Sequence, residues 1–360
     1  MKKNKRKELH IFALNNDFSG SNRALSTAIK QLIADDFCII LHTSNSKGHL
    51  SNLDSVVYKR NFYFYSSNKM LTLVSFFVSQ FYQFFYIVVA LKASKHAVLG
   101  NTALSVFAIF SARLKGCCSI IYVHETFVNP RFFRLIARFI IKNFATHIIF
   151  VSHFVKHEWH LGHRSNTVVS NVSPFPYNSK KITGGPFRVL MPSSPRDYKG
   201  IPEFFELARA NTNMLFHLVL SGSKKVSERY LSRFQLPSNL EITVQPNSMF
   251  AIYQKASVVL NLSRTDTCKE AFGLTIVEAF SFSLPVIVPP VGGPAEIVRD
   301  QIDGFHIDST QIKHISSLLY KLKTDDKLYK KISQSARERC KNFQKSAISQ
   351  VITKHIKIYD

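Results

Sequence analysis

ASVVLNLSRTDTCKEAFGLTIVEAFSFSLPVIVPPV, the stretch over residues 256–291, holds the pattern that decides the fold. It begins with an apolar run at 258–262, crosses a polar loop, and becomes helical in pattern near 272–273. A second apolar run follows at 286–288. Short apolar runs on both sides of a helical segment predict a β-loop-α-β unit.

Two carboxylates, Glu270 and Glu278, lie in this unit, the first in the loop and the second within the predicted helix. Glu278 is the only charged residue between positions 274 and 284, and apolar residues surround it on every face. A helix that is apolar all round is buried, so Glu278 needs a dedicated partner. The free backbone N–H groups at Gly273 and Leu274 could receive a phosphate at the start of this helix.

Length and composition indicate a globular protein of about two domains. The chain has 360 residues, and one domain takes roughly 150. Hydrophobic residues make up 46% of it, which is enough for real cores and argues against disorder. The five cysteines are odd in number and form no CxxC pair, so we expect a reducing compartment and no zinc site.

The net charge of +24 requires an anionic partner or surface. Residues 1–180 hold 22 Lys+Arg against 7 Asp+Glu, whereas residues 181–360 hold 25 against 16. The first half is therefore the more basic. Because no zinc-finger, basic leucine-zipper or RNA-recognition pattern occurs, nucleic acid is not expected as a partner, and a bilayer or a phosphorylated small molecule is favoured.

Residues 71–91 contain no charge and could span a bilayer by length, although no signal peptide precedes them. Polar residues recur along the segment at helical steps, opposite a row of phenylalanines; they are Thr72, Ser75, Ser79, Gln83 and Tyr86. This stripe favours an ordinary helix buried in the protein. An interfacial helix that touches lipid and a transmembrane span stay as alternatives.

Strand-like and helical runs alternate along the whole chain, which predicts parallel sheets flanked by helices. A Gly/Pro/Ser-rich segment near residues 177–186 separates two such series. We therefore expect one α/β domain over 1–180, a second over 181–340, and a C-terminal helix over 341–360 that packs back on the first. Gly20 lies in a loop between the first strand-like run and a helix, where such sheets hold anions.

In open α/β sheets, ligands bind beyond the carboxyl ends of the strands. In the second domain this rule gathers the loops 193–200, 221–224 and 264–272 along one edge. These loops carry cations, glycines, a helix start and Glu270. Such an edge suits a diphosphate attached to a group rich in hydroxyls.

The same residues resemble family 4 of the retaining glycosyltransferases, or glycosyl transferases group 1. The likeness lies in EAFGLTIVEA at 270–279, which is the E-x7-E motif of that family, then in LPVI at 284–287, VGGPAEIV at 291–298 and DGF at 303–305. It is clear over residues 187–310 and looser before them. The resemblance implies the GT-B architecture, α/β with two Rossmann-like doubly wound parallel-sheet domains that face a cleft, and a C-terminal helix crossing back to the first domain.

The resemblance also implies roles for residues in the second domain. Glu278 would hold the ribose hydroxyls of a nucleotide-sugar, and Glu270 would contact the sugar that is transferred. The backbone amides of Phe272, Gly273 and Leu274 would lie on the sugar side of the diphosphate. Its phosphates would be neutralised by Lys199 and Arg196. The chain departs from the family where many relatives have Gly-Arg, because it has Ser193 and Ser194 there.

In the first domain, the resemblance implies that the loop of Gly20 closes over the diphosphate and that His124 lies near the reacting sugar. Glu270 and His124 are thus the candidate catalytic residues. Neither a metal ion nor a cofactor is expected, because lysine, arginine and a helix dipole can balance the phosphates.

The function that these expectations support is transfer of a sugar, with retention, from a nucleotide diphosphate sugar to a hydroxyl of a glycan or lipid-linked glycan. Synthesis of lipopolysaccharide, O-antigen or capsule would fit. The protein would be cytoplasmic, with peripheral contact to the inner face of an anionic membrane. A nucleotide-sugar epimerase of GT-B type and a non-catalytic basic module that binds membrane or nucleic acid are the alternatives.

Overall fold

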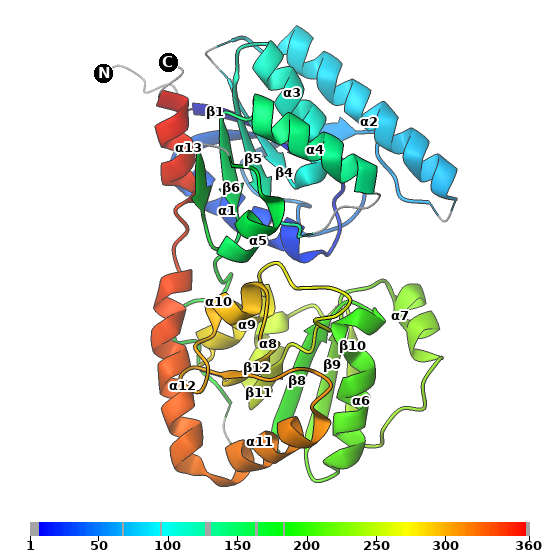
Figure 1. The fold of residues 1–360 in the computed structure, drawn as a ribbon, viewed down its shortest axis with the longest axis vertical. Coiled ribbons are helices and arrows are strands. Elements are labelled where there is room, and N and C mark those ends of the chain that lie inside the picture. Colours follow the sequence, from blue (N-terminus) through cyan, green and yellow to red (C-terminus); the bar gives the residue numbers. More distant parts are fainter. Residues whose placement is uncertain are drawn as a thin grey trace. The chain divides into compact units, whose positions relative to one another are not determined.

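The computed structural model of the protein describes residues 7–66, 68–93, 96–126, 131–162, 165–182 and 184–357. They form two compact units, and each unit is built on its own parallel sheet (Figure 1). The first unit comprises Met1–Asn171 with Ser346–Asp360, and the second comprises Val172–Lys345. The predicted α/β class with two parallel-sheet domains is confirmed.

The sheet of the first unit has the order β3-β2-β1-β4-β5-β6-β7, and all its neighbouring strands are parallel. Its strands are β1 (Lys7–Ala13), β2 (Phe37–Ser44), β3 (Val56–Asn61), β4 (Ala97–Asn101), β5 (Cys118–Val123), β6 (His147–Phe150) and β7 (Asn166–Val168). Ile11 of β1 is in register with Leu41 and Leu99 on its two neighbours, and all three side chains are fully buried. Strands covered on both faces read as continuous apolar runs, which made them visible in the sequence.

The helices of the first unit include a long one, α2, and a C-terminal one, α13. They are α1 (Gly20–Ala34), α2 (Lys69–Ala90), α3 (Val106–Leu114), α4 (Arg131–Phe144), α5 (His153–Trp159) and α13 (Ile348–Lys357), with a short 3-10 turn η1 (Ala103–Ser105). The chain returns to this unit at its end, where Gln31 of α1 donates a hydrogen bond to the backbone oxygen of Ser346 at 2.8 Å. The return begins at Ser346, a few residues after the expected position at 341.

The sheet of the second unit has the order β10-β9-β8-β11-β12-β13 and is also fully parallel. Its strands are β8 (Arg188–Ser193), β9 (Leu215–Leu220), β10 (Leu240–Val244), β11 (Val258–Leu260), β12 (Val286–Val288) and β13 (Phe305–His306). The helices are α6 (Ile201–Ala210), α7 (Lys224–Leu231), α8 (Met249–Lys255), α9 (Leu274–Ser281), α10 (Gly293–Ile297), α11 (Ile312–Thr324) and α12 (Asp326–Cys340), with 3-10 turns η2 (Asp197–Lys199) and η3 (Lys341–Phe343).

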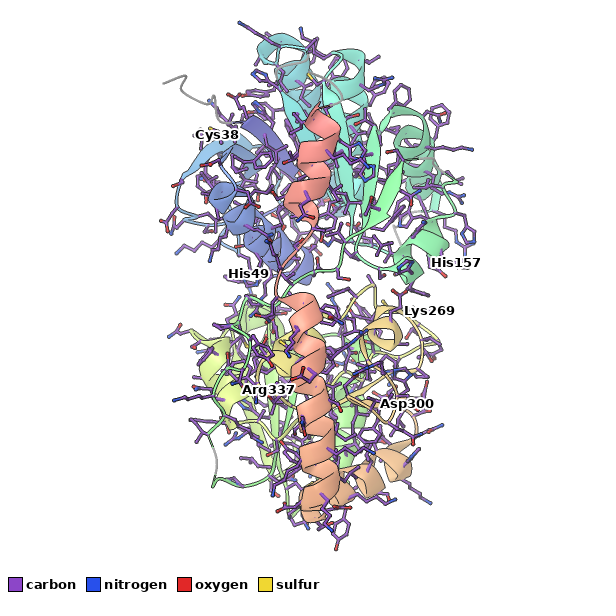
Figure 2. All side chains as sticks on the ribbon, turned by 90° about the vertical axis from the view of Figure 1, so that its left-hand side faces the viewer. Cys38, His49, His157, Lys269, Asp300 and Arg337 are labelled. Carbon is purple, nitrogen blue, oxygen red and sulfur yellow. The ribbon has the colours of Figure 1, made fainter. Side chains whose placement is uncertain are left out.

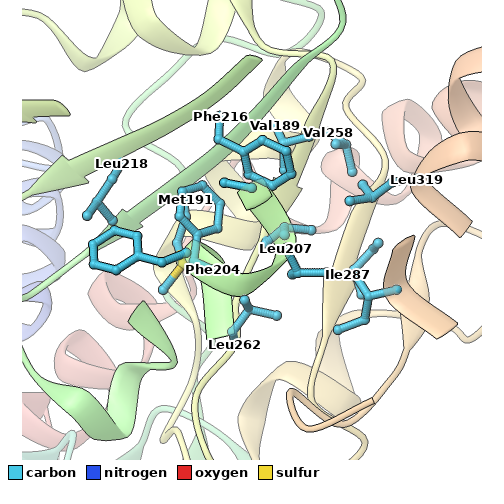
Figure 3. Packing of buried hydrophobic residues seen from close by; sticks show 14 of the residues in the cluster. Val189, Met191, Phe204, Leu207, Phe216, Leu218, Val258, Leu262, Ile287 and Leu319 are labelled. Carbon is cyan, nitrogen blue, oxygen red and sulfur yellow. The ribbon is translucent and has the colours of Figure 1, made fainter. Parts of the chain in front are cut away.

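One core of this unit lies between the sheet and the helices α6 and α11 (Figure 3). Phe204 of α6 packs edge-on against Phe216 of β9, with ring centroids 5.2 Å apart. Leu319 of α11 and Met191 of β8 belong to the same cluster, and both are buried. Full burial of such side chains stabilises a fold by about 1.5 to 3 kcal/mol each, so this core fixes the strands whose ends carry the predicted site.

The boundary between the units falls earlier than the sequence indicated, because the segment before residue 180 is hydrogen-bonded to the second unit. The backbone N–H of Ser179 donates to the carbonyl of Ser281 at the end of α9, at 2.8 Å. Arg337 lies on α12 (Figure 2). Its guanidinium lies over the ring of Tyr177, 5.6 Å from the centroid. A segment rich in Gly, Pro and Ser can therefore lie beyond a boundary and still be ordered by its contacts.

The orientation of α2 contradicts the prediction of an ordinary buried helix. Its buried residues are almost all polar, namely Ser75, Ser79, Gln80 and Gln83, with Ile87 as the exception. Its large apolar residues are exposed instead. The helix is long and apolar enough to cross a membrane. Only 33% of its most apolar 18-residue stretch is buried in the protein. The periodicity was real, but it did not tell which face packs on the sheet.

Candidate active site

The strand order of the second sheet places its topological switch point between β8 and β11. In doubly wound sheets, ligands bind beyond the carboxyl ends of the strands at this point. The loop after β8 carries Lys199, and the loop after β11 carries Glu270. The strand order alone therefore places Lys199 and Glu270, two residues of the predicted site, at the position where ligands bind in such sheets.

Lys199 and Glu270 are in direct contact. The ammonium group of Lys199 donates to Glu270 Oε2, and the hydroxyl of Ser263 donates to the same oxygen at 3.0 Å. Both charged side chains are about four-fifths shielded from solvent, with exposed fractions of 22% and 21%. A charge-assisted hydrogen bond in such a setting is stronger than one on the surface.

Burial and the opposite charge act against each other on this ion pair. Burial tends to raise the pKa of Glu270, but the charge and hydrogen bond of Lys199, with the bond from Ser263, outweigh it and hold the pKa below its ordinary value. Burial likewise tends to lower the pKa of Lys199, yet Glu270 raises it above the ordinary value. Both groups are therefore charged at neutral pH.

A glycine with a left-handed backbone sets the turn that presents Lys199. Gly200 has φ +79°, and a Cβ there would lie 2.1 Å from the backbone oxygen of Leu262. Only glycine at position 200 therefore allows the turn η2 to lie this close to the loop after β11. The backbone N–H of Arg264 donates to the carbonyl of Tyr198 at 2.8 Å and joins the two loops.

Two further glycines support the backbone of Glu270. A Cβ at Gly292 would lie 2.7 Å from the carbonyl oxygen of Glu270, and one at Gly293 would lie 2.2 Å from that of Ala271. The N–H of Gly293 donates to the Glu270 carbonyl at 2.9 Å. Gly292 and Gly293 thus do more than turn the chain into α10, because they let it lie directly against the Glu270 loop.

Phe272, Gly273 and Leu274 form the entry to α9. Phe272 is buried, and Gly273 has φ +100°, a conformation that favours glycine over any residue with a side chain. Leu274 is the first residue of the helix, just after the start near residues 272–273 that the sequence predicted. The helix therefore begins four residues after Glu270, the carboxylate of the ion pair. Its free N-terminal N–H groups follow Glu270 closely in the sequence.

Glu278 lies one turn into α9 and is 1% exposed, so its predicted burial is confirmed. The hydroxyl of Tyr253 on α8 donates to Glu278 Oε2 at 2.7 Å. The ring of Tyr253 is itself stacked on Phe282, with centroids 5.5 Å apart. A carboxylate can be kept in an apolar interior when a rigid donor is supplied in this way.

Arg196 does not join this cluster. Its side chain is exposed and makes no hydrogen bond or ion pair within the described part of the chain. The arginine nearest in sequence to the loop of Glu270 is Arg264, which is bound to Glu203 of α6 at 2.6 Å. Of the two cations predicted to face phosphates, only Lys199 lies in the ion pair with Glu270.

A cavity of about 570 Å³ lies elsewhere in the second unit, between α8 and the edge of the sheet at β10. Arg188, His217 and Glu241 form a polar cluster on its wall, and Gln245 to Ser248 line its end after β10. None of the predicted site residues lines it.

In the first unit, His124 follows β5 at the carboxyl edge of the sheet. The residue is buried, and its Nε2 atom has no hydrogen-bond partner among the described residues. Burial lowers its pKa to about 3, so the ring is neutral at pH 7. Glu125 follows it, and its Oε2 atom accepts from the backbone N–H groups of Ala103 and His124, each at 3.2 Å. Burial raises the pKa of Glu125 in spite of these bonds.

Asn101, which ends β4, is a candidate that the sequence did not reveal. It is 1% exposed, and both polar atoms of its side chain lack partners among the described residues. It lies one strand from His124, because Asn101 is in register with Tyr122. Unsatisfied buried polar groups are costly, and they cluster where a ligand completes them. The only available signal was a polar residue at the end of an apolar strand.

Gly20 is the first residue of α1, next to the switch point between β1 and β4. A Cβ placed there would meet nothing within 4 Å, so a side chain at this position would have room. The glycine that the nearby backbone does require is Gly48, where a Cβ would lie 2.4 Å from the N atom of Asp17. The position of Gly20 agrees with the expected loop, whereas its residue type is not dictated by packing.

One group of three potential metal ligands occurs in the part of the chain that the structure describes: Glu8, His10 and His96. These residues lie at or just before the amino ends of β1 and β4. Glu8 Oε1 is 3.0 Å from His10 Nε2 and 3.4 Å from His96 Nε2. The group is therefore at the edge of the sheet opposite to His124 and Asn101.

Two further residues that the sequence did not reveal bind the predicted carboxylates. Ser263 binds Glu270 within the loop after β11, and Tyr253 binds Glu278 from α8. The carboxyl-end rule could have found Ser263. Nothing in the helical pattern of α8 singles out Tyr253, since a tyrosine on such a helix is more often a core residue.

Comparison with known proteins agrees with this geometry. Residues 177–339 match the family model of glycosyl transferases group 1. A sucrose synthase of Beta vulgaris is 43% identical over 67 residues, which is 18% of this chain but only 9% of that protein.

Solved structures match over almost the whole chain. The Anabaena protein HepE, in complex with UDP-glucose, has a TM-score of 0.75 at 15% identity, with 98% of both chains covered. The lipopolysaccharide outer core galactosyltransferase WaaB has a TM-score of 0.66 at 14% identity, with 98% of this chain and 99% of that one covered. Residues 177–339 are therefore similar to the glycosyl transferases group 1 family, and the whole chain has the GT-B fold.

Proposed function

We propose that the protein is a retaining glycosyltransferase of family 4 that moves a sugar from a nucleotide diphosphate sugar to a hydroxyl of a glycan or lipid-linked glycan. The observation that carries this proposal is the Lys199–Glu270 ion pair, held by glycines at the switch point of the second sheet, in the loop that leads into α9. A cation and a helix start together provide a site for a diphosphate.

Departure of the nucleoside diphosphate is the step that this site would assist. Negative charge develops on the diphosphate as the bond to the sugar breaks, and fixed positive charge lowers the energy of that state. Glu270 keeps Lys199 protonated and in place, since it raises the pKa of the ammonium group. Glu270 would also accept hydrogen bonds from hydroxyls of the sugar, while Glu278 holds the ribose from the interior of α9. We propose no metal ion or cofactor.

The first unit would supply groups for the reacting sugar. His124 is neutral because burial lowers its pKa to about 3, so its Nε2 atom can accept or donate one hydrogen bond to a sugar hydroxyl. Asn101 lies at the end of the neighbouring strand with both amide atoms unpartnered among the described residues. The helix start at Gly20 suits the diphosphate.

The acceptor and the location are further parts of the proposal. HepE was solved with UDP-glucose, and WaaB is a lipopolysaccharide galactosyltransferase, so proteins of this fold act on such donors and glycans. Residues 1–180 carry 22 Lys+Arg against 7 Asp+Glu, which suits an anionic surface. We propose synthesis of lipopolysaccharide, O-antigen or capsule at the inner face of the cytoplasmic membrane.

Release of nucleoside diphosphate from a panel of UDP-, GDP- and dTDP-sugars tests the class of reaction. We expect one donor to be turned over by the wild type, and turnover to fall at least about 100-fold in Glu278→Gln, because a buried hydrogen-bonding group to the donor is changed. Glu206→Gln is the matched control, since Glu206 is exposed on α6. Full activity of Glu278→Gln would overturn the site, and a sugar epimerised on its nucleotide would indicate an epimerase instead.

A further inference from the structure

The outer face of α2 is apolar over its whole length. Its exposed large residues are Met70, Leu71, Leu73, Val74, Phe77, Val78, Phe81, Phe85 and Val89. Phe81 is 62% exposed and Val89 79%. A continuous row of this kind is rare on a surface that meets only water, and it marks an interaction site.

The inner face of α2 is held to the first unit by polar side chains. The hydroxyl of Ser75 donates to the carbonyl of Phe64 at 2.8 Å, and the hydroxyl of Ser79 donates to Asn61 Oδ1. Gln83 Nε2 donates to Ser79 Oγ at 3.3 Å. A helix that meets water would have the opposite orientation, with these residues outside. The inverted arrangement indicates that the outer face is covered by apolar material.

A second helix, α4, continues this surface. It runs beside α2 with α3 against both (Figure 1), and the rings of Phe76 and Phe133 meet edge to face at 5.4 Å. Its exposed apolar residues are Phe132, Leu135, Ile136 and Phe139. We call the exposed residues of α2 and α4 the α2–α4 surface.

The charges at this surface have one sign. The sequences of α2 and α4 contain no Asp or Glu, and they contribute Lys69, Arg131, Arg134, Arg138 and Lys142. Two of the arginines are tied to backbone carbonyls of the same unit, Arg134 to Glu158 at 2.7 Å and Arg138 to His160 at 3.3 Å. Two copies of this chain would bring like charges together, whereas an anionic lipid surface would neutralise them.

The contacts of α2 also decide between crossing a membrane and lying on it. A helix that crosses would have to leave the sheet, which would expose Ser79, Gln83 and their partner Asn61 to lipid. Unsatisfied polar groups are costly in that medium. Ile87 on the same inner face is fully buried in the first unit. A helix held along one side can only lie flat, with its other side in the interface.

We propose that the α2–α4 surface docks on the anionic leaflet of a lipid bilayer, with the phenylalanines of α2 among the acyl chains and the cations of α4 at the headgroups. This inference deepens the proposed function, on which it rests for its purpose, because a lipid-linked acceptor would then be met at the membrane surface.

Sedimentation of the full chain with vesicles tests the proposal. We expect binding to vesicles of phosphatidylcholine with 30% phosphatidylglycerol. Binding of Phe81→Glu/Phe85→Glu should be about 100-fold weaker, since two exposed aromatic side chains that would enter the bilayer are lost. The matched control is Val226→Glu/Tyr320→Glu, which adds the same charge at exposed apolar residues of the second unit and should bind like the wild type. Equal weakening in the control would overturn the assignment of the surface.

A second variant keeps the proposal testable if the first does not fold. Arg131→Gln/Lys142→Gln should bind the anionic vesicles about 20- to 30-fold more weakly, since each cation near such a surface contributes about fivefold. It should bind pure phosphatidylcholine vesicles as the wild type does. Equal binding of the wild type to both lipids, or dimerisation through this surface without vesicle binding, would overturn the anionic bilayer as the occupant.

Donor turnover without vesicles separates this inference from the proposed function. The α2 and α4 variants should release nucleoside diphosphate as the wild type does, because no residue of the proposed donor site is changed. Vesicle binding as predicted in a protein that turns over no donor would leave the docking surface standing and remove the proposed function. Donor turnover with no vesicle binding would do the reverse.

Discussion

Helices α9 and α2 have similar compositions but opposite surroundings. Both are apolar with a few polar residues, and each has a buried polar residue that is hydrogen-bonded, Glu278 to Tyr253 in α9 and Ser79 to Asn61 in α2. The apolar residues of α9 pack within the second unit, with α12 beside it, whereas those of α2 face outward. A buried polar residue therefore marks the face that packs on protein, and apolar residues alone do not.

The buried polar residues of α9 and those of α2 also differ in their expected roles. In α9, burial places a carboxylate beside a helix start and an ion pair, where a ligand can use it. In α2, hydrogen bonds of Ser75, Ser79 and Gln83 hold the polar face to the protein and turn the apolar face outward. The first kind of site should be essential for activity, and the second for stability.

The largest effect is expected at the ion pair that precedes α9. Lys199→Met should lower donor turnover by about 1000-fold, because the developing charge on the diphosphate loses its fixed cation. The pKa of Glu270 should rise, since burial remains and the opposing charge is gone. Steady-state release of nucleoside diphosphate measures the first effect. Lys330→Met is the control, as Lys330 is exposed on α12, and equal losses in both variants would remove the special role of Lys199.

Acid should weaken the first unit more than the second, in which burial also lowers the pKa of His217. Burial lowers the pKa of His42 to about 2 and of His124 to about 3, from 6.5. Below pH 6.5 the unfolded chain binds protons at these rings and the folded unit does not, so the free energy of unfolding falls by up to about 1.4 kcal/mol per pH unit and histidine. Glu270, whose pKa is lowered, stabilises the second unit above its unfolded value of 4.5 and loses this effect only at lower pH.

Urea unfolding followed by tryptophan fluorescence can resolve this difference, because Trp159 is the single tryptophan of the chain and lies in the first unit. Between pH 6.5 and 5 its transition should move to lower urea concentration. His124→Gln should make the change smaller, as one titrating ring is removed. A transition that does not move with pH would contradict the burial of neutral histidines.

A smaller effect is expected on the inner face of α2. Ser79→Ala should destabilise the first unit by about 1 to 3 kcal/mol, because Asn61 loses a buried donor. Phe81→Ser, two residues away on the exposed face, should change the stability by less than about 0.5 kcal/mol. Thermal unfolding of the two variants measures both. The reverse order would mean that α2 packs through its apolar face.

Much of the fold and part of the site could be read from the sequence. The apolar strands of two parallel sheets are visible because both faces are covered, and the carboxyl-end rule brought the loops of Lys199 and Glu270 to one edge. Glu278 was recognised as buried since it was the only charge in an apolar helix. These features depend on local pattern and on topology, which the sequence carries.

What could not be read depends on contacts between elements. The period of α2 fixes two faces but not which one meets the sheet, and only the partners of Ser79 and Gln83 decide that. Tyr253 is a donor to Glu278 because α8 and α9 lie side by side, which no spacing shows. Asn101 is recognised as a candidate only in the structure, where both polar atoms of its buried side chain lack hydrogen-bond partners among the described residues. The domain boundary moved because hydrogen bonds, not composition, hold the segment before residue 180.

The central claim is that the carboxyl edge of the second sheet binds a nucleotide diphosphate sugar through Glu278 and Lys199. Its most direct test is the thermal shift of the wild type and of Glu278→Gln with UDP-, GDP- and dTDP-sugars, since a ligand at 100 times its dissociation constant stabilises a fold by about 2.7 kcal/mol. We predict that one of these donors raises the melting temperature of the wild type and leaves that of Glu278→Gln nearly unchanged. An equal shift in both proteins, or no shift with any donor, would contradict the claim.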